Sequence, residues 1–395
     1  MGSGPHLFLV AGEPSGDALG ASLMQGLKQL APGVRFSGVG GPLMEAEGLK
    51  SLFPMAELSV MGLAEVLPRL PALLRRVRET ATEVVSLAPD ALITIDSPDF
   101  CLRVAARARM QAPALKTIHY VAPTVWAWRP ERAAKMARHI DHVLALFPFE
   151  PPYMQAEGMS CDFVGHPVVS TPQPEADEIA GFRHEIGLRE GDRMLLVLPG
   201  SRAGEVARMG PVFGEVLGRL AAGRDDLRVV VPTTANMAET VKGLVRDWPF
   251  SPRLIDPRAD SDAAKHKRLA FAAADAALAA SGTVSLELAA AQTAVVIAYR
   301  FNWLTTRIIK KKVKLDSATL VNILTESRAV PEFLFEECCG DLIAPKVAAL
   351  LDDPAQREAQ LAASRRALAM LGKGGEAPGL RAARSVLRFV GRDDG

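Results

Sequence analysis

The sequence is poor in cysteine, in net charge and in long apolar runs, and each shortage excludes a class of protein. Its four cysteines include one adjacent pair and no CxxC spacing, which suits no ordinary disulfide framework and predicts a reduced, cytoplasmic protein. The formal net charge of +1 excludes a positive electrostatic field over the whole protein that would attract a polyanion such as nucleic acid. No apolar stretch is long enough to span a bilayer, and no secretory signal opens the chain.

The loops of the common nucleotide-binding folds are also missing. Residues 11–17 (AGEPSGD) follow the first apolar stretch, where a dinucleotide fold would carry G-x-G-x-x-G. They have neither that spacing nor the lysine of a Walker A loop. Residues 38–41 (GVGG) fail the same test, because Leu43 stands in place of the third glycine. The sequence therefore disfavours a nicotinamide dehydrogenase.

The His, Cys and acidic residues show no metal-ligand spacing. The nearest approach is Asp260-Ser261-Asp262, which resembles the D-x-D metal motif of some glycosyltransferases. It precedes a helical pattern and does not follow a buried strand, so we interpret it as a helix cap. We expect neither a metal nor another cofactor.

The sequence does contain a regular alternation of apolar strands and helical segments over 395 residues, of which 49% are hydrophobic. The length suggests two domains, and the alternation predicts an α/β fold with two doubly wound parallel sheets. We expect domains at residues 6–168 and 191–344, a linker at 169–190 and a helical tail at 345–395. Strands are predicted at residues 7–11, 34–39, 91–95, 116–121, 142–147, 194–198, 227–232, 276–280 and 294–298, and helices include 17–30 and 99–110.

Two turns in the second domain suit a phosphate. In residues 194–206 (MLLVLPGSRAGEV) an apolar strand runs into a tight turn and a helical pattern, and the unpaired N–H groups of a helix start favour anions. Arg202, after Ser201, would add a fixed cation. A second turn, SGT at residues 281–283, has Glu287 on the same helix face, placed to accept two ribose hydroxyls. Either turn alone could be an ordinary strand–helix connection, whereas the two together favour a nucleotide diphosphate site.

The first domain carries acidic residues with different local roles. In ITIDSPDF, Ser97, Pro98 and Asp99 predict a helix start with an N-cap, a proline at the first position and an acid in the first turn. Asp96 instead ends a buried strand, where it could deprotonate a substrate hydroxyl within hydrogen-bond reach. Glu13, in the first loop, either lines a cleft or is an exposed acid.

Two histidines and a tryptophan allow alternative roles. His119 ends another predicted strand and Trp126 follows it, a pairing that suits stacking on a sugar as well as ordinary core packing. His166 precedes Pro167 near the linker and could serve only to brace it.

Two stretches are basic and apolar at once. Residues 301–314 mix aromatic side chains with five cations, and residues 63–77 repeat apolar side chains at helical spacing among arginines, although Pro68 and Pro71 argue against one continuous helix. Each stretch could pack on the core with a solvated basic side, or dock on an anionic membrane surface. We name as the leucine patch the residues Leu63, Val66, Leu67, Leu70, Leu73 and Leu74, which Val77 follows at the same spacing.

Ten motifs in order, reaching nearly the whole chain to about Glu337, carry a family resemblance: AGEPSGDALGA, GVGGPLMEAEG, VMGLAEVLPRL, IDSPDF, HYVAPTVWAW, FPFEPPY, FVGHP, LPGSRAGEV, SGTVSLE and VNIL. With them the chain resembles bacterial lipid-A-disaccharide synthase, a family of inverting, metal-independent glycosyltransferases with a GT-B-like fold. The family joins UDP-2,3-diacylglucosamine to the 6-hydroxyl of 2,3-diacylglucosamine 1-phosphate. The products are UDP and the β-1′,6-linked disaccharide of lipid A, a part of the lipopolysaccharide of Gram-negative bacteria.

The resemblance also implies residue roles. Carried over by motif, Asp96 is the base on the acceptor hydroxyl and Glu13 lies near the acceptor, in a first domain that faces the membrane. The second domain would bind the UDP-sugar. The residues implied to hold the UDP portion are Ser201, Arg202, Ser281, Gly282, Thr283, Glu287 and Asn322.

The family implies a peripheral protein on the cytoplasmic face of the inner membrane, in contact through the leucine patch, and a homodimer made by exchange of C-terminal segments. The tail after Gly340 matches none of the motifs, so it is expected either to pack back on the first domain or to be exchanged. Two other functions stay open. Another UDP-sugar enzyme of this fold, a muramyl-pathway transferase or an epimerase, would not need the leucine patch. A catalytically silent membrane-surface scaffold would bind lipid without releasing UDP.

Overall fold

The computed structural model describes residues 4–58, 63–126, 130–280, 284–300 and 317–391, with only the backbone at 63–69. The chain forms two compact units, Met1–Ser170 with Leu371–Gly395, and Thr171–Met370. Two predicted features, the SGT turn and the basic stretch 301–314, lie outside the described residues.

The first unit is built on a six-stranded parallel sheet in the order β2-β1-β3-β4-β5-β6. Its central strands are buried on both faces, as a parallel sheet covered by helices requires. The five predicted strands are confirmed, whereas the sequence missed β6, in which Ser160 and Asp162 interrupt the apolar pattern. The strands are β1 (His6–Ala11), β2 (Arg35–Val39), β3 (Ala91–Ile95), β4 (Thr117–Tyr120), β5 (His142–Ala145) and β6 (Ser160–Phe163).

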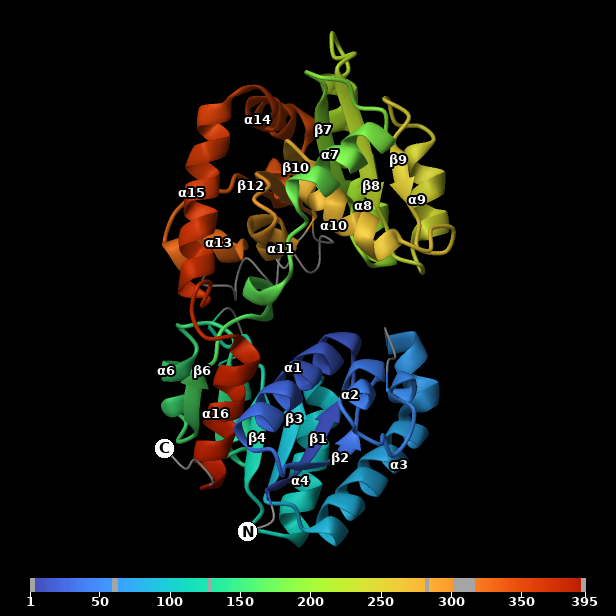
Figure 1. Cartoon of the computed structure of the whole chain (residues 1–395). Helices are drawn as coiled ribbons and strands as arrows, with labels where there is room; N and C mark the ends of the chain where they lie inside the picture. Colours follow the sequence, from blue (N-terminus) through green and yellow to red (C-terminus); the bar gives the residue numbers. More distant parts are fainter. Residues whose placement is uncertain (1–3, 59–62, 127–129, 281–283, 301–316, 392–395) are drawn as a thin grey trace. The chain divides into compact units, whose positions relative to one another are not determined.

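Helices cover this sheet. Phe8 of β1 shares a buried core with Val77 of α3 and Val104 of α4. The last helix, α16, lies along α1 (Figure 1), and the two approach so closely that a side chain at Gly379 would collide with Ser22. The helices of this unit are α1 (Pro14–Leu30), α2 (Pro42–Ala46), η1 (Met55–Glu57), α3 (Leu63–Leu87), α4 (Pro98–Gln111), α5 (Glu131–Ala137), α6 (Pro151–Gln155), η2 (Pro167–Ser170) and α16 (Pro378–Val390).

Helix α3 is continuous, so the expectation that its prolines would break it is wrong. Each proline removes one hydrogen bond, at a cost of about 3 kcal/mol in an isolated helix. Burial of the later turns offsets this cost, because Val77, Ala81 and Val84 belong to the core. Of the residues before them, Leu70 is 41% exposed, while Leu73 and Leu74 are half-buried.

The second unit contains another six-stranded parallel sheet, in the order β12-β11-β10-β7-β8-β9. Strands β7 and β10 are parallel neighbours, so their carboxyl ends lie at the same edge of the sheet. The sequence missed β9 and β12, because each has only three residues. The strands are β7 (Arg193–Leu198), β8 (Leu227–Pro232), β9 (Arg253–Ile255), β10 (Ala276–Ala279), β11 (Val295–Tyr299) and β12 (Glu332–Leu334).

Helix α8 packs against α14 over this sheet, and α15 packs against α11 and α13. The C-terminal region is helical, as predicted; α14 and α15 lie in the second unit and α16 in the first. Among the described helices, none is both long and apolar enough to cross a membrane. The helices of this unit are α7 (Ala176–Glu185), α8 (Ala203–Leu220), α9 (Ala238–Val245), α10 (Ala263–Ala273), α11 (Val284–Ala290), α13 (Leu320–Thr325), η3 (Phe335–Glu337), α14 (Gly340–Asp352) and α15 (Pro354–Met370).

Candidate active-site residues

Asp96 lies immediately after β3, where the first loop of the chain meets the sheet edge. Its backbone N–H donates to the carbonyl oxygen of Tyr120 at 2.9 Å. The Ser15 hydroxyl, in the first turn of α1, donates to Asp96 Oδ2 at 3.0 Å. Glu13 is the N-cap residue of α1 and its side chain is exposed. The structure therefore brings the Glu13 loop and Asp96 to one place, with Ser15 as the link.

Backbone strain gathers at this sheet edge. Asp96 (φ 53°), Ser97 (φ 40°) and Val121 (φ 87°) all have left-handed backbones, which cost roughly 1–3 kcal/mol each for residues other than glycine. The left-handed backbone turns the Ser97 hydroxyl toward Gly12, where it is buried without a hydrogen-bond partner in the described structure. Ser97 occupies the predicted N-cap position of α4, with Pro98 and Asp99 in the first turn, but its side chain makes no capping hydrogen bond. Such strain is typical of functional sites.

Both histidines have structural roles. His119 is buried, and its Nδ1 lies 2.8 Å from the Thr94 hydroxyl. Burial lowers the pKa of His119 to about 4, so the ring is neutral at pH 7 and belongs to the core. The pKa of His166 is also lowered to about 4 by burial, and its Nδ1 accepts the Val168 N–H at 3.2 Å. His166 thus braces the chain just before the second unit.

A buried carboxyl group fixes the orientation of Trp126. Glu150 accepts N–H groups from Leu146 (3.1 Å) and Phe147 (3.0 Å) on Oε2, and the Trp126 indole N–H on Oε1 at 3.3 Å. Burial raises the pKa of Glu150 to about 7, against the lowering effect of these donors. The Trp126 ring meets Phe149 edge to face, with centroids 5.0 Å apart. The neighbouring Trp128 lies outside the described residues.

In the second unit, a pocket of about 240 Å³ lies at the carboxyl ends of β7, β8 and β10. It contains three predicted residues, Ser201, Arg202 and Glu287; the predicted Ser281, Gly282 and Thr283 lie outside the described residues. Further lining residues that the sequence analysis missed are Pro232, Thr233, Thr234, Lys267, Phe271 and Val284. The Thr233 hydroxyl is buried and has no hydrogen-bond partner in the part of the chain described, so it is available to a ligand.

The turn after β7 requires glycine. Gly200 has a φ of 125°, and a Cβ there would lie 2.6 Å from the Cβ of Glu205. Glu205 is buried and accepts the Ser201 N–H at 3.1 Å, so it ties the turn after β7 to the first turn of helix α8. Arg202 contacts Glu205 at 3.4 Å, but its side chain is 73% exposed. The guanidinium is therefore free to engage a ligand, whereas the Ser201 N–H is already used.

Asn322 is buried in α13, and both polar atoms of its side-chain amide form hydrogen bonds with the same residue. Its Nδ2 donates to the Val330 carbonyl and its Oδ1 accepts the Val330 N–H, each at 2.9 Å. This pair closes the loop before β12. The implied contact of Asn322 with UDP stays a prediction.

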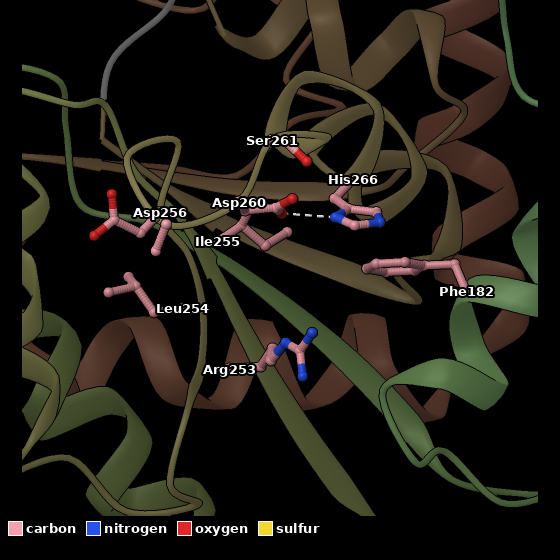
Figure 2. A pocket seen from close by; sticks show the side chains of 9 residues that line it. Phe182, Arg253, Leu254, Ile255, Asp256, Asp260, Ser261 and His266 are labelled. Atoms are coloured by element: carbon pink, nitrogen blue, oxygen red, sulfur yellow. Dashed lines mark hydrogen bonds and ion pairs between the residues drawn. The ribbon is translucent and has the colours of Figure 1, made fainter.

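The D-x-D resemblance directly precedes α10, as predicted; Asp262 is the N-cap residue of this helix, but its side chain makes no capping hydrogen bond, and Asp260 holds the turn before it. Its Oδ1 accepts the Asp262 N–H at 2.9 Å, and its Oδ2 lies 2.6 Å from His266 Nδ1 (Figure 2). The hydrogen bond with His266 is the main reason why the pKa of Asp260 is lowered. Asp260 and His266 line a second pocket in this unit, of about 370 Å³, together with Arg253 and Phe182. Within the described residues, no group of three or more His, Cys, Asp or Glu side chains could hold a metal ion.

Two doubly wound parallel sheets, each with polar side chains at its carboxyl edge, define a GT-B-like protein. Solved structures with this fold include S. aureus MnaA with UDP, similar over 98% of this chain and 97% of that one (TM-score 0.68, 12% identity). A UDP-N-acetylglucosamine 2-epimerase is similar over 100% of this chain and 98% of that one (TM-score 0.64, 14% identity). At these identities the likeness shows the fold alone.

Sequence comparison shows the family. The lipid-A-disaccharide synthetase family model matches residues 7–377. The lipid-A-disaccharide synthase of Ruegeria pomeroyi is 58% identical over 97% of this chain and 94% of its own, and that of Rhodospirillum centenum is 47% identical over the same shares. The chain therefore belongs to the lipid-A-disaccharide synthetase family, and it is an enzyme of the glycosyltransferase class that uses a UDP-sugar.

Proposed function

We propose that the protein is a lipid-A-disaccharide synthase that transfers 2,3-diacylglucosamine from UDP-2,3-diacylglucosamine to the 6-hydroxyl of 2,3-diacylglucosamine 1-phosphate. Family membership over most of the chain supports the reaction. The observation that supports its mechanism is the geometry of Asp96. The Ser15 hydroxyl donates a hydrogen bond to Asp96 Oδ2. Asp96 Oδ1 accepts no hydrogen bond within the described residues and is free to take a proton.

Transfer with inversion is one displacement. Asp96 takes the proton of the acceptor 6-hydroxyl as that oxygen attacks the anomeric carbon, and the bond from this carbon to the diphosphate oxygen breaks. Negative charge then grows on the departing UDP. Arg202 and the N-terminus of α8 supply a fixed cation and a helix dipole for that charge.

The test of this function is UDP release from UDP-2,3-diacylglucosamine with and without the monosaccharide phosphate acceptor. Release that requires the acceptor and yields the disaccharide 1-phosphate supports a synthase. An epimerase would convert the UDP-sugar without the acceptor. A silent scaffold would bind vesicles and release no UDP in either case.

Removal of divalent cations is expected to leave activity unchanged. Arg202 and the start of α8 take the role that a metal has in other transferases. Asp260 already uses both carboxylate oxygens in hydrogen bonds. The measurement is UDP release in excess EDTA, with added Mg²⁺ as the control. A loss of activity that Mg²⁺ restores would contradict the proposal.

The leucine patch is proposed to contact the membrane from which the acylated substrates come. Leu70, Leu73 and Leu74 are exposed or half-buried, with Arg75 exposed beside them. Leucines flanked by cations suit the boundary of an anionic bilayer. The side chains of Leu63, Val66 and Leu67 lie outside the described residues.

Changing Leu70, Leu73 and Leu74 together to serine is expected to lower binding to anionic vesicles while shifting the melting temperature little. Val77→Ser is the matched control on the same helix. Because Val77 is 6% exposed, this change should cost about 2 kcal/mol or more of stability. A folded triple variant that co-sediments with vesicles as well as wild type would place the membrane contact elsewhere.

Two finer points are also proposals, namely a peripheral location on the cytoplasmic face of the inner membrane and a homodimer. α16 offers the segment for an exchange between copies, because it packs on α1 through a surface that another copy could equally provide. Sedimentation of the purified protein in detergent tests the dimer.

A further inference from the structure

The pocket at the carboxyl ends of β7, β8 and β10, which is the proposed UDP pocket, contains a lysine with no role in the mechanism above. Lys267 extends from α10, and its Nζ lies 2.9 Å from Oε2 of Glu287 on α11. The same ammonium lies over the ring of Phe271, 5.0 Å from its centroid. All three side chains line the pocket at the carboxyl ends of the strands.

These contacts restrain two flexible side chains. A lysine loses much rotamer freedom when its position is fixed, and the attraction of an aromatic face and a carboxylate together offsets that loss. Phe271 is buried (4% exposed), so the ring is a rigid support. Glu287 has no other hydrogen bond or ion pair among the described side chains, and its side chain is 51% exposed. Without Lys267, nothing described would aim this carboxylate.

The geometry also leaves acceptor positions of the Glu287 carboxylate open for a ligand. An ionised carboxylate has about four acceptor positions, and the lysine uses one of them on Oε2. Oε1 and the second position on Oε2 can still accept two hydroxyl groups. A vicinal diol presents two hydroxyls at a spacing that one carboxylate can bind.

We propose that Lys267 is a positioning residue for nucleotide recognition. By holding the Glu287 carboxylate in place, it sets the preference of the pocket for a ribonucleotide with both ribose hydroxyls over a 2′-deoxynucleotide. This inference rests on the proposed UDP site. It adds a residue and a specificity to that site.

The experiment is calorimetric titration of wild type and variants with UDP and with 2′-deoxy-UDP. Wild type should bind UDP about tenfold more tightly, because the deoxy analogue loses one hydrogen bond to a charged group. Lys267→Met should weaken the binding of UDP about three- to fivefold and the binding of 2′-deoxy-UDP less. The ratio of the two affinities should therefore fall. Lys267→Arg should keep most of the discrimination.

Lys265→Met is the matched control. Lys265 lies on the same helix, pairs with Glu178 at 3.8 Å and does not line this pocket, so both affinities should stay at wild-type values. In the double variant Lys267→Met/Glu287→Gln, the loss should be no larger than in Glu287→Gln alone, because Lys267 acts through Glu287.

The outcomes separate this inference from the proposed function. If wild type binds UDP but Lys267→Met keeps the full discrimination, the positioning role is wrong and the UDP site stands. If Lys267→Met weakens both nucleotides equally, the lysine contacts a phosphate and the inference is also wrong. If wild type binds no UDP, both the site and the inference fall.

Discussion

Asp96→Asn is expected to lower kcat about 10²- to 10⁴-fold, the usual loss when a general base is removed. The amide cannot accept the proton of the acceptor hydroxyl. It can still accept the Ser15 hydroxyl through its carbonyl oxygen, so the loop geometry should be kept. UDP affinity should stay within a few-fold of wild type, because the proposed UDP pocket is lined by residues of the second unit. The measurements are single-turnover UDP release and UDP titration.

Asp99→Asn is the matched control for this prediction. Asp99 is three residues away, exposed, and lies in the first turn of α4. Its removal should cost only the small helix-dipole contribution to stability and leave turnover unchanged. Near-normal turnover in Asp96→Asn would remove Asp96 from the mechanism, and Glu13 would then be the acid to test.

The fold was largely predictable because both sheets are parallel. Strands buried on both faces appear in the sequence as short apolar runs, and these runs located β1, β3, β7 and β10. The missed strands are those that lack such runs. β6 carries Ser160 and Asp162 on a sheet edge, and β9 and β12 are too short to show a pattern. Edge strands need less apolar side-chain burial, so the sequence marks them weakly.

The candidate site was predictable where local geometry dictates the residue type. Gly200 has a left-handed φ and no room for a Cβ, so the Gly-Ser-Arg turn is visible in the sequence. Ser15 and Lys267 were missed for the opposite reason. Ser15 contacts Asp96 and Lys267 contacts Glu287, a side chain distant along the chain in each case, and no spacing in the sequence indicates such a contact. Only the fold brings these pairs together.

Local rules also failed where tertiary structure overrides them. Ser97 stands before Pro98 like an N-cap, yet its left-handed backbone directs the hydroxyl elsewhere. Pro68 lies within α3 because the later turns of that helix are anchored in the core. In both cases the sequence located the element correctly and the packing decided its detail.

Arg202→Ala is expected to weaken UDP binding about tenfold or more and to slow transfer as well. A hydrogen bond to a charged group contributes about 1.5–3 kcal/mol, and each 1.4 kcal/mol is about a factor of ten in affinity. The Arg202 side chain is 73% exposed, and among the described residues its one ion pair is with Glu205 at 3.4 Å, so the guanidinium is available for a diphosphate. Arg202→Lys should recover part of the loss, since it restores the charge but not the two-pronged contact.

The comparison of UDP with uridine makes this prediction specific to the phosphates. Uridine lacks the diphosphate, so Arg202→Ala should change the affinity for uridine by no more than about twofold. The corresponding free energy is well below the ~1.5 kcal/mol of one hydrogen bond to a charged group. Arg219→Ala is the control, because Arg219 lies at the end of the same helix and pairs with Asp341 on the surface. If Arg202→Ala binds UDP like wild type, the diphosphate does not lie at the start of α8. If it weakens uridine as much as UDP, Arg202 supports the pocket without contacting the phosphates.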